Sequence, residues 1–113
     1  AIEFKVADQT IHVFSLPYLL ATKIEAFKGR GKNQYLTSHD IEDIVTLIDG
    51  RATIASDISN APNDVVEYLK HEFGLMVANA NFLAALDGHI SDRRNIEDRK
   101  ALVLQRINEF LGL

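Results

Sequence analysis

The segments LATKIEAFKGRG (residues 20–31) and SHDIEDIVTLIDGR (residues 38–51) decide the fold of this chain. In the first segment, Leu20, Ile24 and Phe27 recur at the spacing of a helix that buries one face. In the second, apolar residues recur at the same period behind a Thr-Ser pair that can cap a helix. Both segments therefore predict amphipathic helices that pack on a common core.

Both predicted helices carry charged residues at the border of their apolar faces. On a helical wheel Lys23 and Arg30 lie about 60° and about 80° from Leu20, with apolar residues on either side of the pair. Asp40 and Asp43 occupy the matching border of the second helix. The other polar residues of the second helix are expected to face solvent, namely Glu42, Thr46 and Asp49.

Two interpretations of the four border charges stay open. In the first, Lys23 and Arg30 pair with Asp40 and Asp43 across the helix contact and form a structural ion network. In the second, the same groups surround a phosphate-bearing ligand, because lysine and arginine hold phosphates and carboxylates orient metals or bases. His39 stands at the start of the second helix and could join that ligand edge. Spacing alone does not separate the two interpretations.

Composition limits the class of protein. A chain of 113 residues with 47% hydrophobic and 25% charged residues can bury one modest core, so a single domain over residues 1–113 is expected. The net charge of -4 makes direct nucleic-acid binding by this chain an unfavoured function. Cysteine is absent, which excludes disulfides and thiolate metal sites. No apolar run reaches the roughly 20 residues that a bilayer requires, so no membrane association and a cytoplasmic location are expected.

The beginning of the chain predicts a small β element. Residues 2–6 alternate between apolar and polar side chains, and TIHVF (residues 10–14) follows after a short turn. We therefore predict an α+β, mainly α fold, with a β-hairpin at residues 1–14, a remnant of a larger sheet, followed by four to five helices over residues 15–113. One helix is expected to break near Gly74, and GHISDRRN (residues 88–95) is expected to be a loop.

The border charges and their spacing resemble a known family, the AbiEii/AbiGii toxin-type nucleotidyltransferases of the DNA polymerase beta-like superfamily. That family has a Leu-x-x-Lys-x-x-Ala helix, an arginine one to two turns later, and an Asp-hydrophobic-x-Asp-hydrophobic element. The matching positions in this sequence are Leu20, Lys23, Ala26, Arg30, Asp40, Ile41, Asp43 and Ile44. The resemblance covers residues 16–51 and implies that the chain is the downstream, C-terminal portion of a nucleotidyltransferase-like fold.

The resemblance implies a nucleoside triphosphate as substrate. It assigns catalytic roles to Lys23, Asp40 and Asp43. The substrate-binding candidates are Lys23 and Arg30 from the same motif and His39 from its position beside Asp40. The superfamily also needs a Gly-Ser turn and strand carboxylates that hold Mg²⁺, and no Gly-Ser pair occurs in this chain. Magnesium is therefore expected only with a missing upstream half, and no transferase activity is expected from this chain alone.

Partners follow from the same resemblance and from the predicted hairpin. The resemblance implies a toxin with a cognate antitoxin protein as its partner, and the open hairpin edge predicts a homo-oligomer.

The four histidines show no helical i, i+3 or i+4 pairing, so no metal site is expected. The alternative function is a non-enzymatic helical interaction module in which the Lys/Arg–Asp network only fastens helix to helix.

Overall fold

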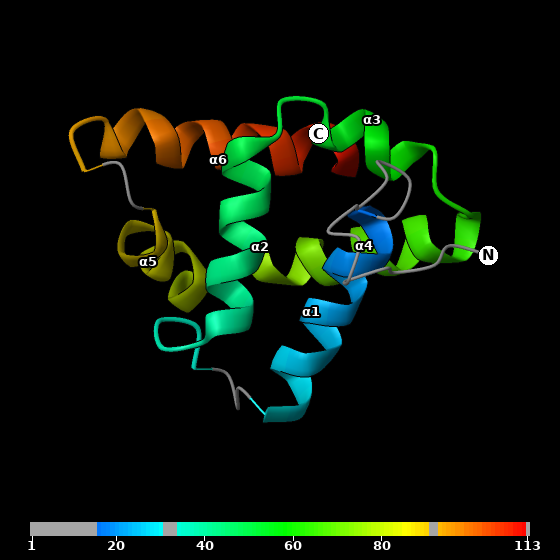
Figure 1. Ribbon diagram of the computed structural model, residues 1–113, viewed down its shortest axis with the longest axis horizontal. Coiled ribbons are helices and arrows are strands. Elements are labelled where there is room, and N and C mark those ends of the chain that lie inside the picture. Colours follow the sequence, from blue (N-terminus) through cyan, green and yellow to red (C-terminus); the bar gives the residue numbers. More distant parts are fainter. Residues whose placement is uncertain (1–15, 31–33, 91–92, 113) are drawn as a thin grey trace, which may run out of the picture.

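Six helices make up the described part of the chain (Figure 1). The structure, a computed structural model, describes residues 16–30, 34–90 and 93–112. The helices are α1 (Leu16–Arg30), α2 (His39–Gly50), α3 (Ile54–Ser59), α4 (Asn63–Val77), α5 (Ala80–His89) and α6 (Ile96–Leu111). None of the six helices in these ranges combines the length and the apolar content that a bilayer crossing requires.

The predicted α+β fold is wrong. The described residues contain helices and no strand, and the predicted hairpin at residues 1–14 falls outside them. The physical reason is that each helix buries its apolar face against other helices, so this core closes without a sheet. Alternation over five residues indicates only a local preference, whereas a fold class depends on what covers each apolar face.

The helix α2 lies at the centre of the core. It packs against α1, α5 and α6, and α6 lies across its C-terminal end (Figure 1). Its buried apolar residues are fully enclosed, namely Ile41, Ile44, Val45 and Ile48. The predicted stripe on α1 is confirmed, since Leu20, Ile24 and Phe27 are all buried against this core.

Local chemistry explains where several helices begin and end. The Ser38 hydroxyl accepts a hydrogen bond from the amide of Ile41 at 3.1 Å, which caps α2. The Asn79 side chain accepts one from the amide of Asn81 at 2.8 Å and caps α5 in the same way. The helix α6 ends at Gly112, whose φ of 85° is the left-handed conformation that glycine adopts without strain.

Two predicted element boundaries are wrong. Gly74 lies inside α4, and the chain leaves the helix only after Val77. The segment predicted as a loop from residue 88 starts inside a helix, because α5 continues through Gly88 to His89. A Cβ built on Gly88 would lie 2.8 Å from Cδ1 of Leu36, so the glycine lets that leucine lie directly on the helix backbone.

Candidate functional site at the junction of α1 and α2

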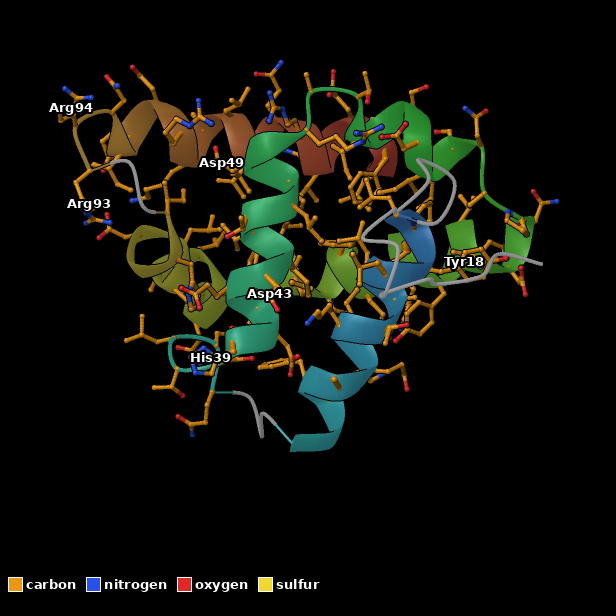
Figure 2. The ribbon with its side chains drawn as sticks, in the orientation of Figure 1. Tyr18, His39, Asp43, Asp49, Arg93 and Arg94 are labelled. Atoms are coloured by element: carbon orange, nitrogen blue, oxygen red, sulfur yellow. The ribbon has the colours of Figure 1, made fainter. Side chains whose placement is uncertain are left out.

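The contact between Lys23 and Asp43 joins α1 to α2. The Lys23 ammonium donates a hydrogen bond to Oδ2 of Asp43 at 2.7 Å. Figure 2 shows Asp43 on the side of α2 that faces α1. The side chains are 30% and 49% exposed, so both remain in contact with solvent. This geometry gives an accessible cation beside an accessible carboxylate.

Asp40 occupies a different environment from Asp43. It lies in the first turn of α2 and is only 4% exposed, whereas Asp43 lies one turn later at the surface. The amide groups at a helix N-terminus favour a negative charge at that position. The two acids of the predicted motif are therefore divided between the core and the solvent.

The two remaining predicted substrate-binding residues lie at helix ends. Arg30 is the last residue of α1, and its side chain lies outside the described part of the structure. His39 begins α2, and its exposed ring lies 3.3 Å from Oε1 of Glu42 through Nδ1 (Figure 2). The structure therefore brings Lys23 and Asp43 into contact. The neighbour of His39 is Glu42 rather than either aspartate of the motif.

A second polar cluster joins α1 to α4. Lys28 lies 3.1 Å from Oε2 of Glu72 and 3.6 Å from Oε2 of Glu25, and its ammonium stands 5.7 Å from the ring centre of Tyr68. The Tyr68 hydroxyl donates a hydrogen bond to Glu25. The Lys28 side chain is 48% exposed, and its head group links α1 to α4.

The α1–α4 cluster shifts the proton affinity of its members. The hydrogen bond from Tyr68 lowers the pKa of Glu25, and the nearby Lys28 lowers it further. The hydrogen bond to Glu72 is the main cause that raises the pKa of Lys28. Burial raises the pKa of Tyr68, and its hydrogen bond to the Glu25 carboxylate adds to that increase. The charged forms of Glu25 and Lys28 and the neutral hydroxyl of Tyr68 are thus favoured by their surroundings.

The C-terminal end of α2 is held by two arginines of α6. Nη1 of Arg106 donates to the carbonyl oxygens of Ile48 and Asp49 at 2.8 and 2.7 Å. Nη2 of Arg99 donates to the Asp49 carbonyl at 3.1 Å and lies 2.7 Å from Oδ1 of the Asp49 side chain. The contact between Nη2 and Oδ1 is a close ion pair whose angles do not fit a hydrogen bond. Oδ1 of Asp49 therefore has no hydrogen-bond partner among the described residues.

The contacts of Arg99 and Arg106 with the end of α2 were not predicted from the sequence, which indicated that Asp49 faces solvent. Its side chain is only 20% exposed because α6 approaches the polar side of α2. Two features of the sequence could have indicated these contacts. Arg99 and Arg106 are seven residues apart and so share a face of one helix, and α2 has no basic residue of its own in its last turn.

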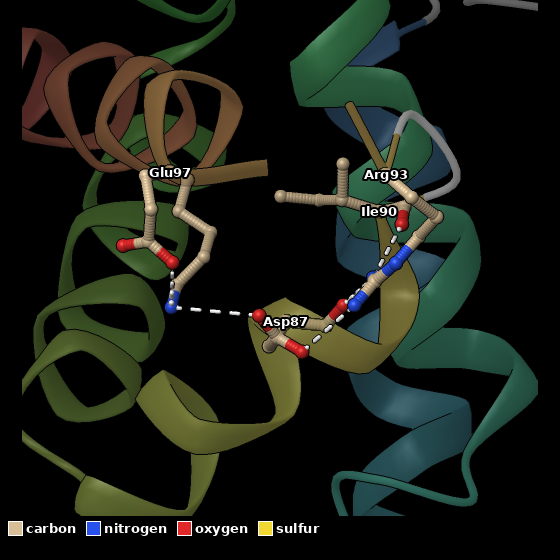
Figure 3. A network of polar contacts seen from close by, with 5 residues as sticks. Asp87, Ile90, Arg93 and Glu97 are labelled. Atoms are coloured by element: carbon tan, nitrogen blue, oxygen red, sulfur yellow. Dashed lines mark hydrogen bonds and ion pairs between the residues drawn. The ribbon is translucent and has the colours of Figure 1, made fainter. Parts of the chain in front are cut away.

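Two basic residues near the start of α6 pair with groups of the same protein, namely Arg93 before the helix and Lys100 within it. Arg93 donates to the carbonyl oxygens of Asp87 and Ile90 and also pairs with the Asp87 side chain at 3.0 Å (Figure 3). Lys100 lies between the carboxylates of Asp87 and Glu97, at 3.7 and 3.5 Å. The hydrogen bond from Arg93 is the main cause that holds the pKa of Asp87 below its ordinary value.

A buried histidine ties the loop before α2 to α5. His89 is 9% exposed, and its Nε2 lies 2.6 Å from the carbonyl oxygen of Tyr35, to which it donates a hydrogen bond. The sequence interpretation placed His89 in a loop and gave it no role. Its position at the last turn of α5 fixes where the loop carrying Tyr35 meets that helix.

In the described ranges, no three carboxylate, imidazole or thiolate side chains lie close enough together to hold a metal ion. Comparison with protein-family models, with curated proteins and with solved structures gave no match. The resemblance carried by Lys23, Asp40 and Asp43 therefore rests on the residue pattern alone.

Proposed function

We propose that this chain is the helical part of a nucleotidyltransferase-like protein of the AbiEii/AbiGii type, in which Lys23 contacts the phosphates of a nucleoside triphosphate. The observation that supports the proposal is the accessible ion pair of Lys23 and Asp43, at 2.7 Å on the α1–α2 junction. The toxin role and the antitoxin partner that the resemblance implies belong to the same proposal.

The exposure of the pair is what leaves Lys23 available to a ligand. Ion pairs at this level of exposure contribute only about 0–1 kcal/mol to stability. A polyphosphate offers more negative charge than one carboxylate and forms strong charge-assisted hydrogen bonds with an ammonium group. The exchange of Asp43 for a phosphate oxygen as the partner of Lys23 therefore costs the fold little.

The two acids take different roles in the proposal. Asp43 is accessible and holds the Lys23 ammonium at the α1–α2 junction before the nucleotide arrives. Asp40 is buried, so its role is to stabilise the first turn of α2. The proposal assigns Mg²⁺ and the transfer reaction to the upstream half that the resemblance implies, and it derives no step through magnesium from the residues of this chain.

A titration of the 113-residue chain with ATP, CTP, GTP and UTP, followed by amide chemical shifts in NMR spectra, tests the phosphate contact. Shifts are expected in the segments of α1 and α2 that flank Lys23 and Asp43. Lys23→Met removes the ammonium and is expected to abolish them. Asp43→Asn removes the competing carboxylate, worth at most about 1 kcal/mol, and is expected to tighten binding by up to about fivefold.

Lys28→Met is the matched control, because Lys28 lies on the same helix but pairs with Glu72 and Glu25 of the α1–α4 cluster. This variant is expected to keep the nucleotide shifts. Equal loss in the Lys23 and Lys28 variants would mean that nucleotides respond only to net charge, and the proposed contact would then be wrong. Shifts that survive Lys23→Met unchanged would also remove Lys23 from the site.

A second candidate function is a non-enzymatic helical interaction module, favoured by the direct pairing of Lys23 with Asp43 across the helix contact. In that case the pair only fastens α1 to α2. Lys23→Met and Asp43→Asn would each lower the unfolding free energy by about 1 kcal/mol or less. No nucleotide would shift the spectrum of any variant, which separates this function from the first.

A further inference from the structure

A pocket of about 210 Å³ lies between α1, α2 and α4, and we call it the Tyr35 pocket. Its apolar wall comes from all three helices, and none of the four side chains is more than 5% exposed: Ile24, Phe27, Ile41 and Met76. An apolar cavity of about 150 Å³ is large enough to hold benzene. The Tyr35 pocket therefore has room for a single ring with a short chain.

The hydroxyl of Tyr35 is the first polar group of this pocket. The residue is only 8% exposed, and its ring centre lies 4.7 Å from that of Phe27. The hydroxyl has no hydrogen-bond partner among the described residues. It is not sealed in the core either, because the fully enclosed side-chain polar atoms without a partner in these ranges are Oδ1 of Asp49 and Nε of Arg99. Buried tyrosines normally pair their hydroxyl, so this one is left for a group in the pocket.

Glu72 supplies the second polar group. Its side chain is only 13% exposed, and its Oε2 accepts a hydrogen bond from Lys28 at 3.1 Å. Its Oε1 has no partner among the described residues. Burial is the main cause that raises the pKa of Tyr35, and the negative charge of Glu72 adds to that increase. The carboxylate thus lies near enough to act on the Tyr35 hydroxyl.

We propose that the Tyr35 pocket binds a small primary amine, whose apolar body of about one aromatic ring fills the pocket and whose ammonium group donates to Oε1 of Glu72 and to the Tyr35 hydroxyl. Hydrogen bonds from an ammonium group to a carboxylate are among the strong ones in proteins. The ligand thereby satisfies both polar groups that the protein leaves without a partner.

Charge selects an amine over an acid. Two carboxylates, of Glu25 and Glu72, share the single ammonium of Lys28, at 3.6 and 3.1 Å. One negative charge therefore stays uncompensated, and a bound ammonium group neutralises it. A ligand carboxylate would instead be the third acid beside Lys28.

Amide chemical shifts in NMR spectra of the full chain test the proposal with three probes that share a phenyl ring: 2-phenylethylamine, 2-phenylethanol and phenylacetate. The amine is expected to bind with a Kd of about 1 mM or lower and to shift amides of residues 24–28, 35 and 72–76. The alcohol keeps the ring but lacks the charge, so its Kd should be at least about fivefold higher. Phenylacetate should bind more weakly than the alcohol because its charge is repelled.

Two substitutions separate the charge from the hydroxyl. Glu72→Gln is expected to reduce the preference for the amine over the alcohol to less than about twofold. Glu67→Gln is the matched control, because Glu67 is exposed on the same helix and does not line the pocket. Tyr35→Phe keeps the ring and should raise the Kd of the amine by about threefold or more. It should not lower the urea midpoint, since the hydroxyl makes no hydrogen bond within the described protein.

Four results would overturn the proposal. The first is the absence of shifts with about 10 mM amine, which means that the pocket holds only water. The second is equal affinity for the amine and the alcohol, and the third is an effect of Glu67→Gln as large as that of Glu72→Gln. The fourth is a lower urea midpoint for Tyr35→Phe, which means that the hydroxyl is paired within the protein. All four are independent of the nucleotide titration, because Lys23 and Asp43 do not line the pocket.

Discussion

The substitution Arg106→Met tests whether α6 stabilises the end of α2. Methionine keeps the apolar stem of the side chain but removes the guanidinium that donates to the carbonyls of Ile48 and Asp49 at 2.8 and 2.7 Å. These carbonyls belong to the last turn of α2, where a helix leaves acceptors without partners and favours a positive charge. We expect the variant to fold with lower stability.

The magnitude follows from what each carbonyl loses. A hydrogen bond to a charged group contributes about 1.5–3 kcal/mol. The low end applies, since the Ile48 carbonyl also accepts the amide of Arg51 at 3.4 Å and the Asp49 carbonyl also accepts Arg99 at 3.1 Å. Two bonds at or slightly below this low end, which share one donor atom, give an expected loss of about 2–3 kcal/mol in the free energy of unfolding.

Urea unfolding followed by circular dichroism measures this loss. At a slope of about 1.5 kcal/mol per molar urea, the midpoint is expected to fall by about 1.3–2 M. Arg93→Met is the matched control, because Arg93 also donates to carbonyls at a helix end but is 57% exposed. Its loss should stay below about 1 kcal/mol. A midpoint shift for Arg106→Met no larger than that of the control would refute the reasoning.

Three further predictions concern single polar contacts. Because Asp87 has a lowered pKa, its ionised form stabilises the protein above about pH 4, and this stability is lost as the pH falls further. In Asp87→Asn the urea midpoint should therefore fall less between about pH 5 and about pH 2 than it does in the unmodified protein. Tyr68→Phe removes the donor that lowers the pKa of Glu25, so an NMR titration should find that pKa raised. His89→Leu leaves the Tyr35 carbonyl without its donor and should cost about 1–3 kcal/mol in urea unfolding, more than His89→Gln.

The helical core could be predicted from the sequence because it depends on local periodicity. The buried stripe of α1, the cap at Ser38 and the apolar face of α2 are all present. The break predicted at Gly74 was wrong because α4 buries Phe73 and Met76 on either side of it. A glycine inside a helix costs about 1 kcal/mol, which is less than the gain from burying two such side chains.

Contacts between distant segments could be predicted only in part. The pairing of Lys23 with Asp43 was among the predicted contacts, because both lie on the borders of consecutive helices. The contact of Asp49 with Arg99 was not predicted, since a helical wheel describes one helix and contains no information about the approach of α6. The role of Lys23 in nucleotide binding stays a prediction, because neither periodicity nor an ion pair identifies a ligand.

The fixed ends of α2 have a consequence for the order in which backbone amides exchange with solvent. Ser38 holds its first turn, two arginines hold its last, and its apolar residues between them are enclosed. Fraying from either end is therefore suppressed, and the central amides of this helix open only when the whole protein unfolds. They should exchange most slowly in the molecule, at a rate that reports its global stability.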